Sequence, residues 1–370
     1  MNENAKVKQI IEKIKLLGHL ERFNKTYEIM EPLGKGAQGE VFSLMKRANQ
    51  KMYCVKKVRT SVTDSGQLLV LLREILCLKY NTGPGLLKAK RIFIYIDSEE
   101  ESLTSMIVTQ KMETDLKNVI YSNQPLCMEQ IRFIAFYLAK GILSLHNNNI
   151  LHRDIKPGNV LVNKDCSTVL CDFGMCRYID RSNRPNCLSV TELTSGITTR
   201  WYRAPEVCFG AAKYFEPIDV WAFGCVVVEM ILRRPFLKGT SDDHQIELIF
   251  ETFGHPPSKM QSEFPHKIKE LLNEYTNIPK SLKMSIPGLR SDLLDLLEKI
   301  FVYDPSKRIS IEGVISHDFF KPLCKLFHNS LTKTLEKITG YRIGEGIFDF
   351  EHDALDPDRL LERIYLETYH

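Results

Sequence analysis

The stretch "ILHRDIKPGNV", residues 150–160, crowds charged and amide side chains between apolar residues. Burying that many polar groups is costly unless each one is hydrogen-bonded or charge-paired. The stretch offers an acid, a cation and an amide in Asp154, Lys156 and Asn159. Asp154 can accept or orient a hydroxyl proton, Lys156 can neutralise charge on a migrating group, and Asn159 offers an oxygen to Mg²⁺. Each residue alone fits an ordinary turn equally well, so the interpretation depends on what surrounds them.

A second acidic position follows in "VLCDFGMC", residues 169–176. Asp172 comes directly after an apolar run that favours a buried strand, and it stands before Phe-Gly. A carboxylate there is well placed as a second hard oxygen ligand for Mg²⁺. The alternative is again a plain turn aspartate.

A glycine-rich segment, "GKGAQGEV" at residues 34–41, lies near the N-terminus. Gly34, Gly36 and Gly39 leave room for backbone N–H groups to approach an anion closely. A bare hairpin turn and a dinucleotide-binding loop are the alternatives. The dinucleotide pattern needs a helix after the glycines, whereas the strand-like run "EVFSLM" follows here. The segment therefore predicts a hairpin that covers a phosphate group.

A lysine and a glutamate between these segments complete the set. Cys54 and Lys56 are two residues apart on a predicted strand and share one face. With Val41, Cys54 would lie against a nucleotide base, and Lys56 would point toward the phosphates. Glu74, on the helical run "LLVLLREILCLKY", is the candidate partner that fixes Lys56. A surface salt bridge is the alternative for this pair.

The order of these elements carries more information than any one of them. A glycine hairpin, a lysine, a helical glutamate, H-R-D-x-K-x-x-N and D-F-G follow one another along the chain. Together they are the parts required for phosphoryl transfer from ATP with Mg²⁺. A γ-phosphate, a metal ion and a hydroxyl must meet at one loop, because such reactions are accelerated mainly by positioning and charge stabilisation.

From residue 23 to residue 323 the sequence resembles a eukaryotic protein kinase, and Lys156 after Asp154 is the serine/threonine form. The resemblance implies an α+β, bilobal fold with a small β-rich N-lobe and a larger helical C-lobe. The sequence pattern agrees with it, because strand-like runs precede residue 110 and helical runs follow Met112. The expected parts are a helical N-terminal extension (1–22), the N-lobe (23–110), the C-lobe (111–323) and a C-terminal extension packed on the lobes (324–370).

Within that family the sequence is most similar to mitogen-activated protein kinases. "VTQKMETDL" (108–116) resembles their hinge, and "TTRWYRAPE" (198–206) resembles their activation segment. The tail from Phe348 resembles the C-terminal extension that these kinases fold across both lobes. The cyclin-binding helix of cyclin-dependent kinases is absent, since "SGQLLVLLREI" stands in its place, so a cyclin partner is not expected. The resemblance also implies that Glu206 pairs with Arg308.

The resemblance assigns roles to individual residues. Adenine would be held by the backbone of Gln110 and Met112, with Thr109 as gatekeeper and Asp115 at the ribose. The implied ATP site comprises Leu33, Gly34, Gly36, Gly39, Val41, Cys54, Lys56, Thr109, Gln110, Met112, Asp115, Leu161 and Cys171. The implied catalytic set comprises Asp154, Lys156, Lys56, Glu74 and Thr199, with Asn159 and Asp172 as metal ligands.

The sequence departs from mitogen-activated kinases at the residues whose phosphorylation regulates activity. Those kinases carry Thr-x-Tyr in the activation segment, whereas the matching positions here read Thr194-Ser195-Gly196. The tyrosine is missing, although the arginines that match its partners, Arg200 and Arg203, remain. A single phosphosite at Thr194 is therefore implied. Its phosphate would be received by Arg73, Arg153 and Arg177.

Composition limits the remaining function classes. A net charge of +4 over 370 residues gives no basic stripe, so nucleic acid is not an expected partner. The polar start "MNENAKVKQIIEK" is unlike a signal peptide, and no apolar run approaches the roughly 20 residues of a membrane span. Ten cysteines at scattered spacings, without a CxxC pair, predict free thiols in the cytoplasm or nucleus.

The expected partners are protein substrates with Ser or Thr followed by Pro, because Arg203 would help to form a proline pocket. An upstream activating kinase is a further expected partner. Two alternatives remain open. A pseudokinase or scaffold would keep the fold without turnover, although such proteins usually lose the lysine or one of the two aspartates. A small-molecule phosphotransferase would not need the peptide-side segment 199–206.

Overall fold

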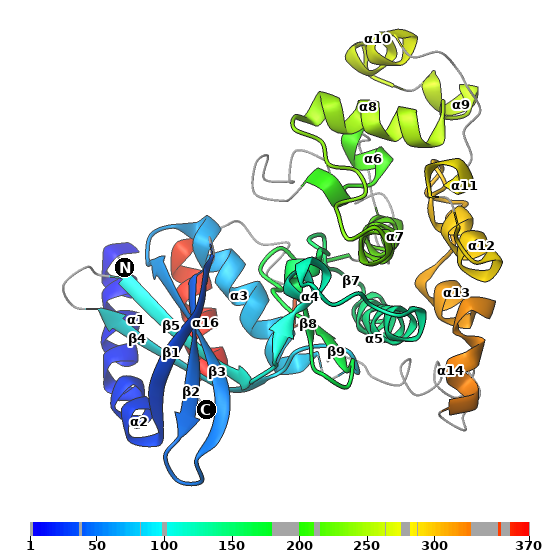
Figure 1. Ribbon diagram of the computed structural model, residues 1–370. Coiled ribbons are helices and arrows are strands. Elements are labelled where there is room, and N and C mark those ends of the chain that lie inside the picture. The colour runs from blue at the N-terminus through cyan, green and yellow to red at the C-terminus, as the bar shows by residue number, and fades with distance from the viewer. Residues whose placement is uncertain are drawn as a thin grey trace.

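The N-terminal part of the computed structural model is built on a five-stranded sheet, and a larger helical part follows it (Figure 1). The bilobal α+β prediction is thereby confirmed. The structure describes residues 3–36, 39–81, 83–97, 102–179, 200–210, 215–262, 264–274, 282–286, 288–326, 347–348 and 356–369.

The sheet has the strand order β1-β2-β3-β5-β4, and each neighbouring pair is antiparallel. Its strands are β1 (Tyr27–Gly36), β2 (Gly39–Lys46), β3 (Lys51–Ser61), β4 (Ala89–Asp97) and β5 (Ser102–Gln110). The strand-like runs expected before residue 110 form these strands. β5 is buried at every position but its last. Its side chains point alternately to the two faces of the sheet, and both faces are covered.

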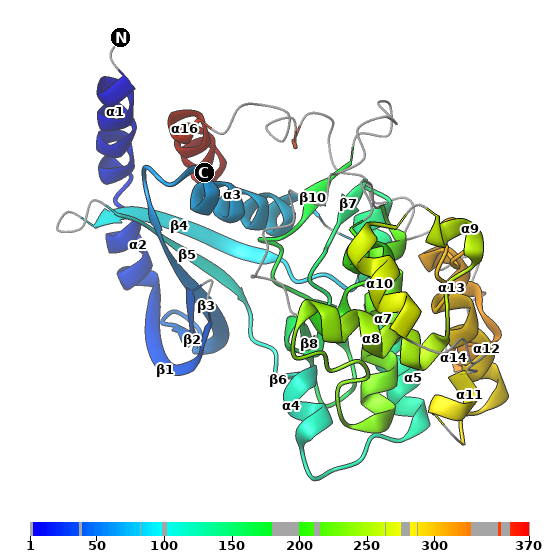
Figure 2. The same cartoon turned by 90° about the horizontal axis from the view of Figure 1, so that it is seen from above.

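Helix α3 (Ser65–Tyr80) lies across the sheet and carries Glu74 (Figure 2). It begins where the side chain of Asp64 accepts a hydrogen bond from the backbone N–H of Gln67 at 3.0 Å. Leu68, Leu72 and Ile75 are fully buried, as the helical spacing of the sequence predicts.

The terminal segments form helices that pack on this lobe. Helix α1 spans Glu3–Leu16 and α16 spans Pro357–Thr368, and their apolar faces join the main core. Asp356 caps α16 by accepting from the N–H of Asp358 at 3.0 Å, and Pro357 follows it at the first helical position. α16 runs beside α3 (Figure 2).

A second N-terminal helix, α2 (His19–Thr26), does not follow from the sequence pattern. It has eight residues, and its buried anchor, Phe23, packs edge-to-face on Phe93 of β4 at 5.5 Å between ring centroids. Contact with the sheet therefore stabilises a helix too short to be stable alone. The predicted boundary between residues 22 and 23 falls inside α2, and the domain boundaries stay predictions.

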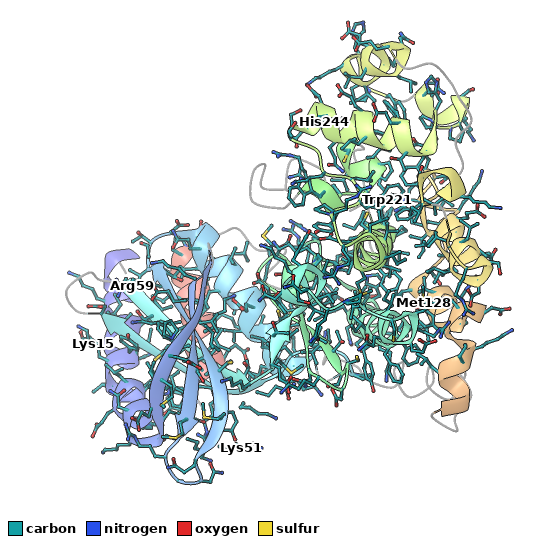
Figure 3. The ribbon with its side chains drawn as sticks, viewed as in Figure 1. Lys15, Lys51, Arg59, Met128, Trp221 and His244 are labelled. Carbon is teal, nitrogen blue, oxygen red and sulfur yellow. The ribbon has the colours of Figure 1, made fainter. Side chains whose placement is uncertain are left out.

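The C-terminal part is mainly helical and is packed around α5 and α7. Trp221 of α7 lies in its core (Figure 3), and Phe223 of the same helix is fully buried. No helix in the described part of the chain is both long and apolar enough to cross a membrane. Its helices are α4 (Leu116–Tyr121), α5 (Met128–His146), α6 (Pro205–Cys208), α7 (Pro217–Leu232), α8 (Asp242–Phe253), α9 (Ser258–Gln261), α10 (His266–Glu274), α11 (Leu282–Ser285), α12 (Ser291–Ile300), α13 (Ile311–Ser316) and α14 (Lys321–Leu326).

Short strands and 3₁₀ turns frame the loops of this lobe. They are β6 (Thr114–Asp115), β7 (Ile150–Leu151), β8 (Val160–Val162), β9 (Thr168–Leu170), β10 (Arg177–Tyr178) and the 3₁₀ helices η1 (Pro157–Asn159), η3 (Arg200–Tyr202) and η4 (Asp318–Phe320). β10 pairs with β7, and β6 pairs with β8, which pairs with β9. These pairings hold both ends of the loop 152–156 in place.

A buried ion pair joins α6 to the end of the lobe, as the resemblance implies. Arg308 donates to both carboxylate oxygens of Glu206, at 2.8 and 2.9 Å, and stacks over the Trp221 ring at 5.1 Å. The two side chains are 0% and 4% exposed. Such bidentate pairs fix geometry, and removing one partner leaves a buried charge alone.

We therefore expect Glu206→Gln to destabilise the protein by about 3–5 kcal/mol. Urea denaturation followed by tryptophan fluorescence measures the change. Glu298→Gln, the same substitution at an exposed position of α12, serves as the matched control and should shift the midpoint little. Equal shifts in both variants would contradict a stabilising role for this pair.

Candidate active site

The loop that contains Asp154 is fixed by one buried carboxylate, Asp219 of α7. The backbone N–H groups of His152 and Arg153 each donate to Asp219 at 2.9 Å, and His146 Nε2 lies 2.9 Å from it. Burial by itself would raise the pKa of Asp219, but the hydrogen bonds from His146 and His152 hold that pKa below its usual value. Arg153 has a φ of 68°, a strained conformation that needs such support.

Asp154 is oriented by two donors. Its Oδ2 accepts from Lys156 Nζ at 2.6 Å and from Asn159 Nδ2 at 2.9 Å. The same Asn159 amide donates to the backbone oxygen of Asp154 at 2.8 Å. No hydrogen bond from any described residue reaches Asp154 Oδ1. One carboxylate oxygen is therefore fixed, and the other is available to a hydroxyl group.

Lys56 connects the two lobes. Its Nζ lies 2.6 Å from Glu74 Oε1 and 3.1 Å from Asp172 Oδ1, so β3, α3 and the D-F-G segment meet at one ammonium group. The Lys56 and Glu74 side chains are 20% and 4% exposed, which rules out a surface salt bridge. Burial opposes the charge on Lys56, but Glu74 and Asp172 raise the pKa of Lys56 above its usual value. The lysine is therefore a fixed cation.

The backbone around Asp172 is held in place by its neighbours. Asp172 has a φ of 66°, and Phe173 next to it is fully buried against the edge of His152, at 5.7 Å between ring centroids. His152 Nε2 lies 3.1 Å from the carbonyl oxygen of Cys171 and donates to it. This packing costs strain at Asp172 and keeps its carboxylate facing Lys56.

The oxygen donors fit a magnesium ion. Asn159 turns its amide nitrogen toward Asp154, so its Oδ1 accepts nothing from the described residues, and Asp172 uses only one oxygen on Lys56. The described residues hold no cluster of three His, Cys, Asp or Glu side chains that could hold a metal. Mg²⁺ does not need one, because it is usually bound through one or two carboxylates together with substrate phosphates and water.

The glycine hairpin has the geometry of an anion cover. A side chain at Gly39, which has a φ of 133°, would place its Cβ 2.4 Å from the Lys57 carbonyl oxygen. Gly34 and Gly36 differ, since a Cβ there would meet nothing within 4 Å. The described residues therefore leave space for side chains at these two positions, and the role of both glycines toward a phosphate group stays a prediction.

The other predicted nucleotide contacts lie on the strands around Lys56. Cys54 pairs with Thr109 across β3 and β5, and burial raises the pKa of the Cys54 thiol. Met112 is buried beyond the end of β5, at the connection between the lobes. The remaining predicted positions are Leu33 and Val41 in the β1–β2 hairpin, Gln110 at the end of β5, Asp115 before α4, Leu161 on β8 and Cys171 after β9. Their roles toward a nucleotide stay predictions.

Asp115 has a structural role as well as its predicted one. Its two carboxylate oxygens accept from the backbone N–H of Asn118 at 2.7 Å and from the Asn118 amide at 3.1 Å. These bonds cap α4.

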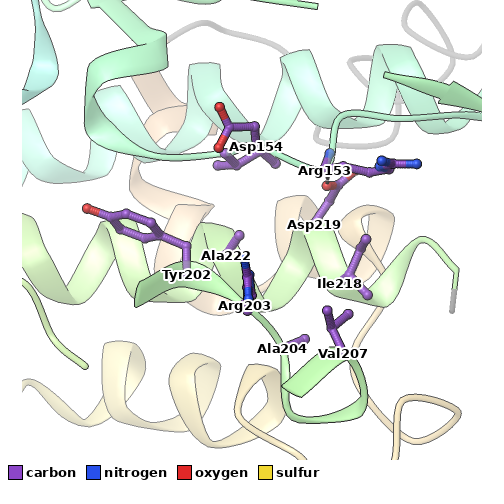
Figure 4. A pocket seen from close by; sticks show the side chains of 10 residues that line it. Arg153, Asp154, Tyr202, Arg203, Ala204, Val207, Ile218, Asp219 and Ala222 are labelled. Atoms are coloured by element: carbon purple, nitrogen blue, oxygen red, sulfur yellow. Dashed lines mark hydrogen bonds between the residues drawn. The ribbon is translucent and has the colours of Figure 1, made fainter. Parts of the chain in front are cut away.

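The acceptor side is formed by η3 and α6. A cavity of about 30 Å³ has Asp154 and Arg153 on one side and Tyr202, Arg203 and Ala204 on the other (Figure 4). The cavity therefore places residues 202–204 opposite Asp154. Thr199 and Thr194 lie outside the described residues.

The predicted phosphotyrosine partners bind a carboxylate of this chain. Arg200 Nε and Arg203 Nη1 lie 3.1 and 3.3 Å from Asp242 Oδ1 at the start of α8. Trp201 donates to the carbonyl oxygen of Gly239 at 2.9 Å, and Tyr202 to Glu229 at 2.7 Å. These contacts attach the segment to the helical lobe.

The predicted phosphate receptors come from neighbouring elements. Arg177 of β10 pairs with Leu151, two residues before Arg153, and Arg73 precedes Glu74 on α3. Cys77, one helical turn after Arg73, and Cys176, next to Arg177, are both buried, and burial together with the Cys77 thiol raises the pKa of Cys176.

The sequence does not identify three supporting residues, Asp219, Glu229 and Asp242. Asp219 and Glu229 are buried acids within the apolar run "PIDVWAFGCVVVEMIL". An acid in so apolar a helix is unusual, and this feature of the sequence could have identified both residues. Nothing in the sequence distinguishes Asp242 from a helix-start acid.

A glycine-rich hairpin, a lysine held by a helical glutamate and two oriented aspartates are the parts that protein kinases use for phosphoryl transfer. The family model described as "Protein kinase domain" matches residues 27–320. The chain belongs to the protein kinase family.

Its curated relatives include mitogen-activated protein kinases. It is 33% identical to "Extracellular signal-regulated kinase 1" of Dictyostelium discoideum over 94% of this chain, and 32% identical to "Mitogen-activated protein kinase 8" of Arabidopsis thaliana over 93%. It spans 63% and 57% of the length of these two proteins. It spans 89% of "Mitogen-activated protein kinase 5" of Oryza sativa subsp. indica, with 30% identity over 93% of this chain. The predicted likeness to mitogen-activated protein kinases is confirmed.

Proposed function

We propose that this protein is an active protein serine/threonine kinase that uses ATP and Mg²⁺ in signalling of the mitogen-activated type. The observation that carries the proposal is the assembled polar chain Glu74–Lys56–Asp172, next to an Asp154 with one free oxygen. When bound, ATP supplies the γ-phosphoryl group and Mg²⁺ neutralises its charge. A pseudokinase would not be expected to keep all these side chains in working geometry.

Each side chain has a separate task in the proposed reaction. Lys56, held by Glu74, binds phosphate oxygens, and Asp172 with Asn159 supplies metal ligands. Asp154 orients the acceptor hydroxyl and takes its proton, while Lys156 stabilises negative charge beside it. A serine or threonine side chain reaches Asp154 past Tyr202 and Ala204 in the small cavity.

We propose that the substrates are proteins phosphorylated at Ser or Thr followed by Pro. Arg203 and Ala204 border the acceptor cavity, where a residue after the target would lie. A peptide-library assay with purified protein, with and without Mg²⁺, tests the proposal. We expect Mg²⁺-dependent labelling of Ser and Thr peptides with Pro at the next position. No labelling of any peptide, despite ATP binding, would identify a scaffold instead.

We predict that phosphorylation of Thr194 activates the enzyme, either by an upstream kinase or by autophosphorylation. A phosphate of about −1.5 to −2 charges would offset the repulsion among Arg73, Arg153 and Arg177 and link α3 to the catalytic loop. Thr194→Ala and phosphatase treatment of wild type should lower activity strongly and equally. Ser195→Ala is the neighbouring control and should change little. Full activity of the dephosphorylated protein would show a constitutive enzyme.

We also propose that the protein works in a reducing compartment, the cytoplasm or the nucleus. All eight cysteines in the described residues are free, and burial raises the pKa of six of them, which keeps those six thiols protonated and unreactive. Fluorescence microscopy of a tagged full-length chain tests this compartment.

A further inference from the structure

A basic cavity lies in the N-lobe, apart from the active site. Its volume is about 620 Å³, and it lies among α2, β4 and the ends of β2, α3 and α16. None of the residues assigned to catalysis, metal or ATP lines it. Six of the lining residues are cations, namely Arg22, Lys25, Lys46, Lys79, Lys90 and Arg91. Among the described residues that line the cavity, Glu367 of α16 is the one acid.

That acid is already neutralised by its neighbours. Glu367 Oε2 accepts from Lys79 at 3.0 Å and from the hydroxyl of Tyr80 at 2.7 Å. Its Oε1 lies 3.1 Å from Arg363 one helical turn earlier. Its charge is therefore balanced before the other cations of the cavity are considered.

Four of the lining cations have no acidic partner among the described residues. Lys25 pairs with Glu21 at 2.7 Å, and Arg22 donates to the neutral carbonyl oxygen of Leu17. In the part of the chain that the structure describes, no carboxylate lies within ion-pairing distance of Arg22, Lys46, Lys90 or Arg91. Like charges that face one concave space repel one another, and an anion placed among them removes that cost.

The pKa values of a lining histidine and of a neighbouring lysine are lowered, mainly by burial and also by the charge of nearby cations. Burial and the charge of Arg22 lower the pKa of His19, and burial and the charge of Lys90 lower that of Lys88. His19 is not one of the cations, since its Nδ1 accepts from the N–H of Ile94 at 3.1 Å. Its ring packs edge-to-face on Phe93 at 5.7 Å, so α2 is fixed against β4. The cavity is therefore formed before any ligand binds.

We propose that this cavity binds a compact polyanion, a small compound with several phosphate groups on one frame, either free in solution or as a lipid headgroup. Cations on separate elements, with Arg22 on α2, Arg91 on β4 and Lys46 on β2, suit an anion with charges on several sides. The volume lies within the range of about 300–1,000 Å³ that is usual for small-ligand sites. Arginine and lysine are the side chains that bind phosphate oxygens most strongly.

The full chain can be tested by calorimetric titration with inositol hexakisphosphate at an ionic strength of about 0.15 M. Sedimentation with phosphatidylcholine vesicles, with or without phosphatidylinositol bisphosphate, forms the second arm. Binding of the soluble compound would show that the cavity takes a polyanion free in solution. Binding only to phosphoinositide vesicles would show that it takes a lipid headgroup. We expect Lys90→Gln/Arg91→Gln to weaken whichever binding occurs by about tenfold or more.

The matched control is Lys259→Gln/Lys283→Gln, which removes the same charge from exposed positions of the helical lobe. It should change affinity by less than about twofold. Lys46→Gln, on a separate strand, gives an independent variant should the double substitution on β4 unfold the protein. No binding in either arm, or equal loss in both double variants, would overturn the proposal. Tighter cavity-dependent binding of a doubly phosphorylated peptide would also overturn it, because the ligand would then be a protein.

Discussion

Asp154→Asn is expected to lower the turnover number for peptide phosphorylation by about 10²-fold or more, while the affinity for ATP stays nearly unchanged. The amide keeps the size of the carboxylate and can still contact Lys156 and Asn159. It cannot take the hydroxyl proton, and it loses the charge that attracts that proton. The loss therefore falls on the chemical step.

Steady-state kinetics with a peptide that the wild type phosphorylates gives the turnover number, and fluorescent nucleotide binding gives the ATP affinity. Asp165→Asn is the matched control, because Asp165 lies in the exposed turn between β8 and β9. We expect it to change turnover by less than about twofold. Wild-type turnover in Asp154→Asn would refute the assigned role.

Lys56→Met is expected to abolish activity, with a loss on the order of 10²-fold or more, because phosphate oxygens and Asp172 lose their shared cation. The effect on stability should be small near pH 5. Burial raises the pKa of Glu74, and without Lys56 this side chain can take up a proton in the folded state.

The pH dependence tests this account. In Lys56→Met the folded state holds a proton on Glu74 that the unfolded chain releases above its usual pKa of 4.5. The stability of the variant relative to wild type should therefore fall as pH rises from that value, until the raised pKa is passed. Adding Glu74→Gln should remove the pH-dependent part without restoring activity. A large loss of stability at every pH would instead identify Lys56 as a structural residue.

Much of the site can be predicted from the sequence because its parts are local. Asp154, Lys156 and Asn159 are within six positions, and their spacing on a short loop already brings their polar atoms together. Glycines in a hairpin and an Asp before Phe-Gly also act through neighbouring residues. The long helices follow from apolar spacing, since one face of each must be buried.

Short elements are the ones that the sequence does not predict. Helix α2 contains eight residues and depends on Phe23 against Phe93, a contact between segments far apart in the chain. The sequence marks Asp219 only as an acid within an apolar helix, and its role becomes clear when the backbone N–H groups of residues 152 and 153 donate to its two oxygens.

By itself, the sequence determined which chemical groups are present and in what order, and that order is enough to identify a protein kinase. Only the tertiary structure decided that Lys56 meets both Glu74 and Asp172, that Asp242 binds Arg200 and Arg203, and that a basic cavity forms beside α2. The physical reason is that a local motif depends on covalent spacing and backbone conformation. An ion pair or a cavity depends instead on burial and on contacts between distant segments, which exist only in the folded chain.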